Sequence, residues 1–375
     1  MSRFHNDRDA VKQGLKDRIE ELCRKLLPDG FRQGRFWISN NPVTGDYDKS
    51  PELKVALDKD IGAWIDWRSG DKGDVIKLVE YLKQCDFPTA MDFARDLIGL
   101  RSMTADQRKR FDERSVEAKR DSDDRAEREQ LQAMKRAEQL FMGGMMDGSR
   151  AAAEAHARAY FRARRCALED VPNRDLETMR FIAATEYWRG ARYETDNRGG
   201  RRKVEAGPKF PAVLSAMRSP LGQQTAVHCT FLHPTEAKKA PLGKETAKLM
   251  LGPAKGSMIR ISHGPEGQPP EMAREAHPLI LCEGIEDGLS LAIAVPPARV
   301  WAAGSLIAMA HAPVHLDCIS CVIVARDNDW GKKQAQEQFA QVLQQLAAAG
   351  KPITEIASHH GKDFNDLAQQ EEEQQ

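Results

Sequence analysis

The sequence predicts an α/β protein whose C-terminal part is a parallel sheet covered by helices, preceded by α+β domains. Three observations support this prediction. From about residue 275 onward, short apolar runs alternate with helical patterns, which is the order that a parallel sheet with crossover helices produces. Before that, a turn-rich region, a charge-rich stretch and a second globular stretch follow one another. With 375 residues, the chain is long enough for two or three domains with cores of their own.

The composition is that of an ordinary globular protein with an added charged component. Apolar residues make up 41% and charged residues 30%, and 56 basic side chains balance 56 acidic ones. A nucleic-acid-binding function would therefore depend on local clusters of positive charge. The polar start and the lack of a long apolar run predict neither a secretion signal nor a membrane span. The seven scattered cysteines favour a reducing, cytoplasmic location.

The first 100 residues combine two helical patterns with a turn-rich stretch. Apolar positions recur at helical spacing over residues 11–26, and a second helical pattern covers residues 75–100. Between them, residues 39–45 read Ser-Asn-Asn-Pro-Val-Thr-Gly, which predicts turns.

A charge-rich stretch follows at residues 101–149. More than half of residues 101–130 are charged, with equal numbers of each sign, and the few apolar positions form no stripe. This pattern is typical of a solvated helix or a connector, so we expect a charged helical linker. An arm that contacts phosphates is the alternative.

Four short apolar runs and the helical patterns between them predict the C-terminal sheet. The runs at 278–282, 299–302, 318–325 and 352–356 have the length of strands, and the longest helical pattern covers 332–349. A parallel sheet of this kind binds its ligand at the carboxyl ends of the strands.

Acidic side chains collect where these strands end. Glu283 follows the first strand, with Asp287 entering the next helix, while Asp327 and Asp329 follow the third strand and Asp363 follows the fourth. Carboxylates crowded at one edge repel one another, and a hard cation such as Mg²⁺, which binds carboxylates, waters and phosphates, relieves that repulsion. The alternative is that these acids only cap helices or face water.

The order and spacing of these motifs resemble the Toprim domain shared by bacterial primases, topoisomerases and some nucleases. The matching segments are Glu-Gly-Ile-Glu-Asp at 283–287, Asp-Asn-Asp at 327–329 and Lys-Asp-Phe-Asn-Asp at 362–366. The resemblance covers about 275–368 and is nearest to the version in small phage- and plasmid-type primase proteins.

The resemblance implies roles for individual residues. We expect Mg²⁺ or Mn²⁺ to be held by Glu283, Asp327, Asp329 and Asp363, of which the first three are the catalytic residues. We expect the nucleotide and its phosphates to contact Asp287, Lys332, Lys333 and Lys362.

The segment upstream supports the primase branch of this family. Residues 210–213, 227–232, 238–240 and 251–253 resemble the domain that precedes Toprim in phage and plasmid primases. Just before it, basic side chains outnumber acidic ones and alternate with aromatic residues and glycines, which suits phosphate contact and base stacking. The expected contacts to single-stranded DNA are Arg189, Arg192, Arg198, Arg201, Arg202 and Lys203. An exposed polar hairpin is the alternative.

The N-terminal region resembles the CHC-type zinc domain that opens bacterial primases, but it lacks the metal ligands. The likeness is in residues 70–81 and 87–100, whereas the ligand positions fall in residues 39–42 and 64–68, which contain neither cysteine nor histidine. Zinc needs thiolate or imidazole ligands, so we expect a degenerate domain without zinc. We expect its tryptophans to fill the core rather than to stack on bases: Trp37, Trp64 and Trp67.

These inferences predict a primase-like enzyme that makes RNA primers on single-stranded DNA in phage or plasmid replication. Its substrates would be nucleoside triphosphates, and a separate replicative helicase would be its partner. A Toprim nuclease and a non-catalytic single-strand-binding protein of replication or anti-defence are the alternatives. The expected segments are a zinc-domain-like region at 1–100, the linker at 101–149, a nucleic-acid-binding α+β domain at 150–272, the Toprim domain at 273–368 and a polar tail at 369–375.

Overall fold

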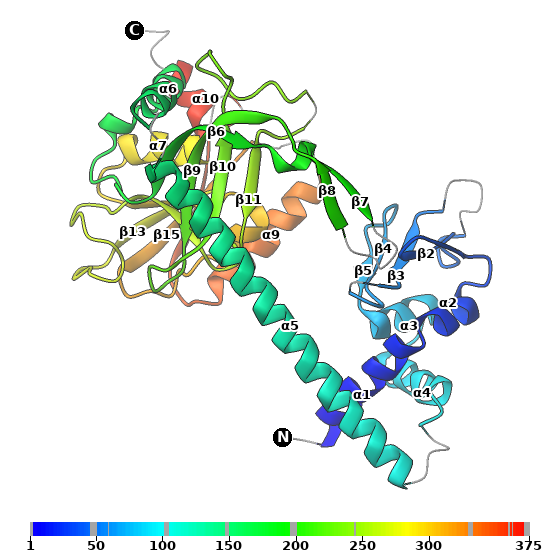
Figure 1. Cartoon of the computed structure of the whole chain (residues 1–375). Coiled ribbons are helices and arrows are strands. Elements are labelled where there is room, and N and C mark those ends of the chain that lie inside the picture. The colour runs from blue at the N-terminus through cyan, green and yellow to red at the C-terminus, as the bar shows by residue number, and fades with distance from the viewer. Residues whose placement is uncertain are drawn as a thin grey trace. The chain divides into compact units, whose positions relative to one another are not determined.

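The structure is a computed structural model of the chain (Figure 1). It describes residues 3–45, 51–58, 60–100, 105–146, 150–195, 201–243, 245–328, 333–358, 361 and 363–370. The chain divides into two compact units, residues 1–127 and residues 128–375, and the boundary lies within the helix α5 (Ala105–Met146). In these described ranges, no helix is long and apolar enough to cross a membrane.

The first unit contains a five-stranded antiparallel sheet whose strands follow one another in chain order. Trp37 lies opposite Val55, which in turn lies opposite Trp64, so these side chains share the buried face of the sheet. Helices supply the other half of this core, including Leu15 and Leu22. The elements are α1 (Arg3–Asp17), α2 (Ile19–Leu26), β1 (Phe31–Gln33), β2 (Phe36–Ser39), β3 (Leu53–Ala56), β4 (Trp64–Asp66), β5 (Lys72–Gly73), α3 (Val75–Lys83) and α4 (Phe87–Leu97).

The helical pattern predicted as continuous over residues 75–100 is in fact two helices. Asp74 caps α3 by accepting hydrogen bonds from the backbone N–H groups of Ile76 and Lys77. Gln84, with φ of 49°, ends that helix in the left-handed conformation. Asp86 then caps α4, which has a proline in its first turn. Asp86 therefore starts a second helix, which is why the helical pattern divides into α3 and α4.

The prediction for the three tryptophans is correct for two of them and wrong for the third. Trp37 and Trp64 are 6% and 5% exposed and belong to the core of the first unit. Trp67 is 65% exposed, because it lies in the turn after β4 rather than in the strand itself.

The charge-rich stretch is part of the long helix α5. Most of its charged side chains are exposed, whereas Ala137 and Phe141 near its C-terminal end are buried in a core of the second unit. The guanidinium of Arg180 lies 5.2 Å from the centre of the Phe141 ring. The division of the chain into five segments stays a prediction.

The second unit contains a nine-stranded mixed sheet and a separate two-stranded hairpin. The hairpin consists of β7 (Arg192–Thr195) and β8 (Arg201–Glu205). The antiparallel part of the sheet consists of β6 (Met179–Glu186), β9 (Lys209–Arg218), β10 (Gln224–Phe231), β11 (Lys248–Leu251) and β12 (Met258–Ser262). The parallel part consists of β13 (His277–Cys282), β14 (Arg299–Ala302), β15 (Ile319–Arg326) and β16 (Ile353–Ala357), in the spatial order β14-β13-β15-β16.

The predicted C-terminal architecture is confirmed. The four predicted strands are β13, β14, β15 and β16, and the long helical pattern is α9 (Lys333–Ala347). The remaining helices of this unit are α6 (Arg150–Ala163), α7 (Ile285–Ala294), α8 (Leu306–Met309) and α10 (Phe364–Gln370), with short 3₁₀ turns at Leu168–Asp170 and Trp188–Gly190. The C-terminal sheet is α/β and mostly parallel, and α+β regions precede it.

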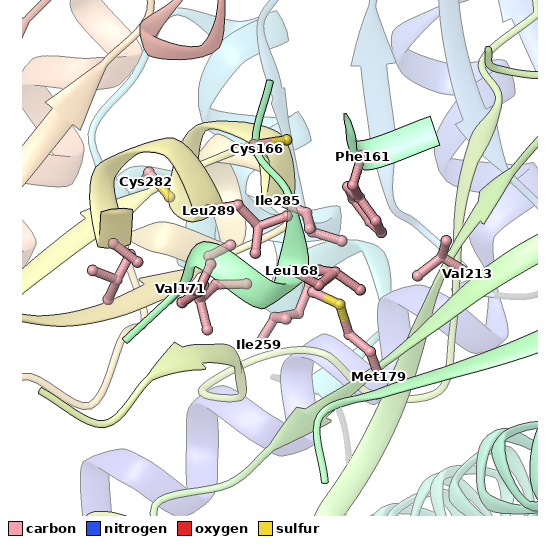
Figure 2. Close-up of a cluster of buried hydrophobic side chains, with 14 of the residues drawn as sticks. Phe161, Cys166, Leu168, Val171, Met179, Val213, Ile259, Cys282, Ile285 and Leu289 are labelled. Carbon is pink, nitrogen blue, oxygen red and sulfur yellow. The ribbon is translucent and has the colours of Figure 1, made fainter. Parts of the chain in front are cut away.

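One buried cluster joins the parallel part of this sheet to the region before it. Figure 2 shows Ile285 and Leu289 of α7 packed around Leu168 and Met179, which come from the upstream region. Each of these side chains is less than 5% exposed. Because the cluster draws on both regions, they share one core.

Candidate active site

The acids that follow the strands lie at the carboxyl edge of the parallel sheet. Leu281 of β13 lies opposite Val324 of β15, and Val324 lies opposite Glu355 of β16, so the three strands end at nearly the same level. Glu283 comes directly after β13, and Asp327 directly after β15. The backbone therefore brings the residues after these strands to one edge.

Asp287 shows that these acids are electrostatically close. It lies in the first turn of α7, is 7% exposed and accepts a hydrogen bond of 3.0 Å from the backbone N–H of Asn365. Burial, together with the carboxylates of Asp363 and Asp327, raises the pKa of Asp287 to about 7. Residues that follow three different strands thus act on one another at this edge.

The pKa of the Cys282 thiol is affected by the same carboxylates. The thiol lies at the end of β13 and is buried. Burial raises its pKa well above the ordinary value, and the carboxylates of Asp287, Asp327 and Glu283 raise it further. The negative charge is therefore concentrated around the end of β13, one of the two inner strands of the parallel part.

Two asparagines fix the loops that carry the acids. Asn365 is fully buried, and its side-chain amide donates to the Ser290 hydroxyl at 3.0 Å and to the Arg164 carbonyl at 2.8 Å. Asn328 donates to the carbonyls of Ser358 and Gly361, which joins the loop after β15 to the loop after β16. Neither asparagine was assigned a role from the sequence, although both lie inside the motifs at 327–329 and 362–366.

Gly284 allows the backbone to approach Asp287 closely. A Cβ atom at this position would lie 2.3 Å from Asp287 Oδ2, well inside contact distance. A side chain at position 284 would therefore force the Asp287 carboxylate to shift, so the glycine leaves room for this acid.

Glu286, next to Asp287 in the chain, also had no role predicted from the sequence. It is 4% exposed and accepts hydrogen bonds from Tyr160 at 2.6 Å and from Lys248 at 3.1 Å, and it forms an ion pair with Lys239 at 2.8 Å. Burial alone would raise its pKa, but Lys248 and Lys239 hold it well below the ordinary value. Behind them, burial and Lys248 lower the pKa of His228 to about 4, so its imidazole is neutral.

Several predicted site residues lie outside the described residues. Asp329, Lys332, Lys362 and Arg198 belong to this group, as do the side chains of Lys333 and Arg201. Among the described side chains, no three histidine, cysteine or acidic residues come together in a way that could hold a metal ion. The structure does describe the expected ligands Glu283, Asp327 and Asp363. Together with Asp287 they lie at the carboxyl end of the parallel sheet, which is called the acidic edge below.

The predicted nucleic-acid-binding segment forms the β7–β8 hairpin and the turn before it. Part of its positive charge is paired with carboxylates: Arg189 with Glu245 at 3.4 Å, Arg192 with Glu205 at 3.4 Å, and Lys203 with Glu186 at 2.7 Å. Arg202 is exposed on β8. These pairs are largely exposed, so a phosphate backbone could compete for the basic groups.

In the first unit, hydrogen bonds connect residues 39–42 with residues 64–68, the two segments aligned from the sequence with zinc-ligand positions. The buried Asn41 side chain donates to the carboxylate of Asp66 and, at 2.7 Å, to the Tyr81 hydroxyl. The other carboxylate oxygen of Asp66 accepts from the backbone N–H of Arg68 at 2.9 Å. An amide, a carboxylate and a phenol are not the donor set that a structural zinc site needs.

Two segments of the chain match known protein families. Residues 278–373 match the Toprim domain, and residues 132–261 match a domain of unknown function. The C-terminal segment is therefore a Toprim domain. No curated protein matches the sequence of this chain.

The chain is also similar to solved primase structures, at low sequence identity. The zinc-binding and RNA polymerase domains of the Aquifex aeolicus primase are 14% identical to it, with a TM-score of 0.36 over 100% of this chain and 84% of that one. The Escherichia coli primase catalytic core is 15% identical, with a TM-score of 0.39 over 64% of this chain and 75% of that one. A DnaG primase catalytic domain bound to single-stranded DNA is 16% identical, with a TM-score of 0.39 over 65% and 78%.

Proposed function

Because residues 278–373 are a Toprim domain, we propose that this chain is a primase-like enzyme that makes RNA primers on single-stranded DNA by Mg²⁺-dependent nucleotidyl transfer. The observation that carries the proposal is the convergence of Asp287, Asp327 and Asp363 at the carboxyl edge of the parallel sheet. A role in phage or plasmid replication and a separate helicase partner belong to the same proposal and rest on the resemblance described above. The cytoplasmic location also belongs to it and rests on the scattered cysteines.

The acidic edge suits a hard divalent cation. Its described donors are carboxylate oxygens, the ligands that Mg²⁺ and Mn²⁺ prefer, and their mutual repulsion is what a bound cation would relieve. Glu283 and Asp327 would hold the ion, with Asp329 and Asp363 as the further ligands that the family resemblance implies. When bound, Mg²⁺ would lower the pKa of the attacking 3′-hydroxyl and neutralise charge on the pyrophosphate that leaves.

The protein's own contribution would be to place the two reactants. Asn328 and Asn365 hold the loops at the edge, so the carboxylates do not have to reorganise when the nucleotide binds. In the reaction, the 3′-oxygen of the growing primer would bond to the α-phosphorus as the bond to pyrophosphate breaks.

The upstream region supports primer synthesis over strand cleavage. Lys239 and Lys248 lie beside the acidic edge, and each keeps part of its side chain accessible. Two ammonium groups next to the carboxylates suit a triphosphate, which carries more negative charge than the single phosphodiester that a nuclease cleaves. The predicted contacts of Lys332, Lys333 and Lys362 with the phosphates remain part of the proposal.

For the first unit we propose a zinc-free version of the CHC-type domain. The hydrogen bonds from Asn41 to Asp66 and Tyr81 support this, because they connect the two ligand-bearing segments without a metal. No step of the proposed reaction depends on zinc.

One assay tests the proposed activity. The full chain is incubated with Mg²⁺ or Mn²⁺, labelled nucleoside triphosphates and single-stranded DNA, and in a parallel reaction with a labelled single strand. Short labelled oligoribonucleotides are the expected product. Cleavage of the labelled strand without synthesis would instead show a Toprim nuclease, and binding without either reaction would show a non-catalytic single-strand-binding protein.

A further inference from the structure

Glu286 belongs to the Toprim domain by sequence, but its side-chain partners do not. The carboxylate lies in the first turn of α7. Oε1 accepts from the Tyr160 hydroxyl of α6 and lies 2.8 Å from the ammonium of Lys239, and Oε2 accepts from Lys248 at the start of β11. All three partners lie within residues 132–261, the segment that matches the domain of unknown function.

The contacts of Glu286 with Tyr160, Lys239 and Lys248 do more than compensate one buried acid, because they hold two lysines in place. A buried carboxylate needs compensation, and one ammonium group with the phenol would supply it. Here two ammonium groups share one carboxylate, which leaves a local excess of positive charge. Without Glu286, Lys239 and Lys248 would repel each other, since the charge of Lys248 lowers the pKa of Lys239. Both lysines in turn hold the pKa of Glu286 below its ordinary value.

Both lysines keep donors for a ligand. An ammonium group has three N–H donors, and Glu286 occupies one on each lysine. The side chains of Lys239 and Lys248 are 37% and 33% exposed, whereas that of Glu286 is 5% exposed. The carboxylate is therefore more deeply buried than the two lysine side chains, each of which keeps about a third of its surface exposed.

The pair also lies next to the acidic edge. Glu286 is adjacent in the chain to Asp287, and the Asp287 carboxylate is close enough to Lys248 to help raise the pKa of that lysine. An anion held by the lysines would therefore lie beside the carboxylates that follow β13, β15 and β16.

We propose that Glu286 is a positioning residue that holds the ammonium groups of Lys239 and Lys248 beside the acidic edge, ready to bind the phosphates of a nucleoside triphosphate. The identity of the ligand rests on the proposed function, whereas the positioning rests on the contacts of Glu286 alone. Tyr160 supports the same carboxylate through one further hydrogen bond.

The test separates charge from position. Binding of ATP with Mg²⁺, and of inorganic triphosphate, is measured by calorimetry on the full chain carrying Glu286→Gln or Glu286→Asp. Glutamine removes the charge, and aspartate keeps it but is one methylene too short to reach both lysines. We expect both variants to bind at least tenfold more weakly than wild type, and Tyr160→Phe to bind about two- to threefold more weakly. The matched control is Glu271→Gln, which removes a carboxylate paired with Arg260 outside this network.

A second readout does not depend on nucleotide binding. The acetylation rates of individual lysines are measured by mass spectrometry, and we expect the rates at Lys239 and Lys248 to change severalfold in Glu286→Gln and Glu286→Asp while other lysines are unaffected. Unchanged rates at both positions would overturn the positioning role. So would Glu286→Asp binding triphosphate as wild type does, because charge alone would then suffice.

The two readouts also separate this proposal from the proposed function. If the wild-type chain binds neither ATP nor triphosphate, the nucleotide assignment fails and the acetylation rates alone decide whether Glu286 positions the lysines. If Glu286→Gln does not fold, as judged by circular dichroism, Glu286→Asp and Tyr160→Phe carry both measurements, since each keeps the buried charge.

Discussion

Replacing Asp287 by asparagine is expected to stabilise the metal-free protein above neutral pH. The pKa of Asp287 rises from 3.8 to about 7 because the side chain is buried beside Asp363 and Asp327. The folded chain therefore keeps a proton that the unfolded chain releases, and folding stability falls as the pH rises through this interval. Above the higher pKa the loss is complete, and a gap of about three pH units corresponds to about 4 kcal/mol.

Asparagine has no proton to release, so the variant avoids this loss of folding stability at high pH, and it keeps the local geometry. Its amide oxygen can still accept the hydrogen bond from the backbone N–H of Asn365. For a unit of this size, about 4 kcal/mol corresponds to an increase in Tm of roughly 8 °C, which should appear at pH 8 and shrink toward pH 5.

Scanning calorimetry in the presence of a chelator measures this effect, with Asp170→Asn, an exposed position in the same unit, as the control. Adding Mg²⁺ should raise the Tm of the wild-type protein at pH 8 more than that of the variant, since the cation relieves the repulsion that the variant already lacks. A difference in Tm that does not grow with pH, or a variant less stable than wild type at pH 8, would refute the argument that these acids repel one another.

The other predictions concern catalysis, strand binding and the first unit. Glu283→Gln and Asp327→Ala should each abolish Mg²⁺-dependent turnover without lowering Tm, and near-normal turnover in either would mean that the site is wrongly assigned. Changing Arg202 and Lys203 together to glutamine should weaken single-strand binding equally for all sequences and reduce the salt dependence by about 0.7 per lost contact; unchanged affinity and salt dependence would show that the hairpin contacts no phosphate. Elemental analysis of the purified protein should find far less than one zinc per chain, and one tightly bound zinc would contradict the zinc-free proposal. Asn41→Ala should lower the stability of the first unit by about 1–3 kcal/mol in denaturant titrations, because it removes the donor to one oxygen of the buried Asp66 carboxylate and to the half-buried Tyr81 hydroxyl; a loss near zero would show that the network is dispensable.

The sequence was most informative where the structure depends on local patterns. The four C-terminal strands were predictable because apolar runs bounded by polar residues stay readable over four to eight residues. The acids at the edge were predictable because topology alone brings the ends of parallel strands together. The break between α3 and α4 was not predicted, although Asp86 followed by Phe87 and Pro88 is a helix-start signal within the apolar pattern.

The rest depends on contacts between residues far apart in the chain. Glu286 reads as an ordinary acid in a first helical turn, and its partners Tyr160, Lys239 and Lys248 lie far upstream in the sequence. For this reason the predicted phosphate contacts were lysines near the Toprim motifs. Trp67 was placed in the core because residue type alone does not tell on which side of a turn a side chain lies.

The core shared by Ile285, Leu289, Leu168 and Met179 sets how this protein can be divided or recombined. The Toprim segment is recognisable by itself, but a fragment that begins at residue 273 would expose the face of α7 that the upstream region covers, and it would be prone to aggregate. An expression fragment should instead begin near residue 128, where the second compact unit starts. By the same reasoning, exchanging the Toprim segment for that of a distant relative would fail unless residues 150–262 were exchanged with it, so the two segments should behave as one module in recombination.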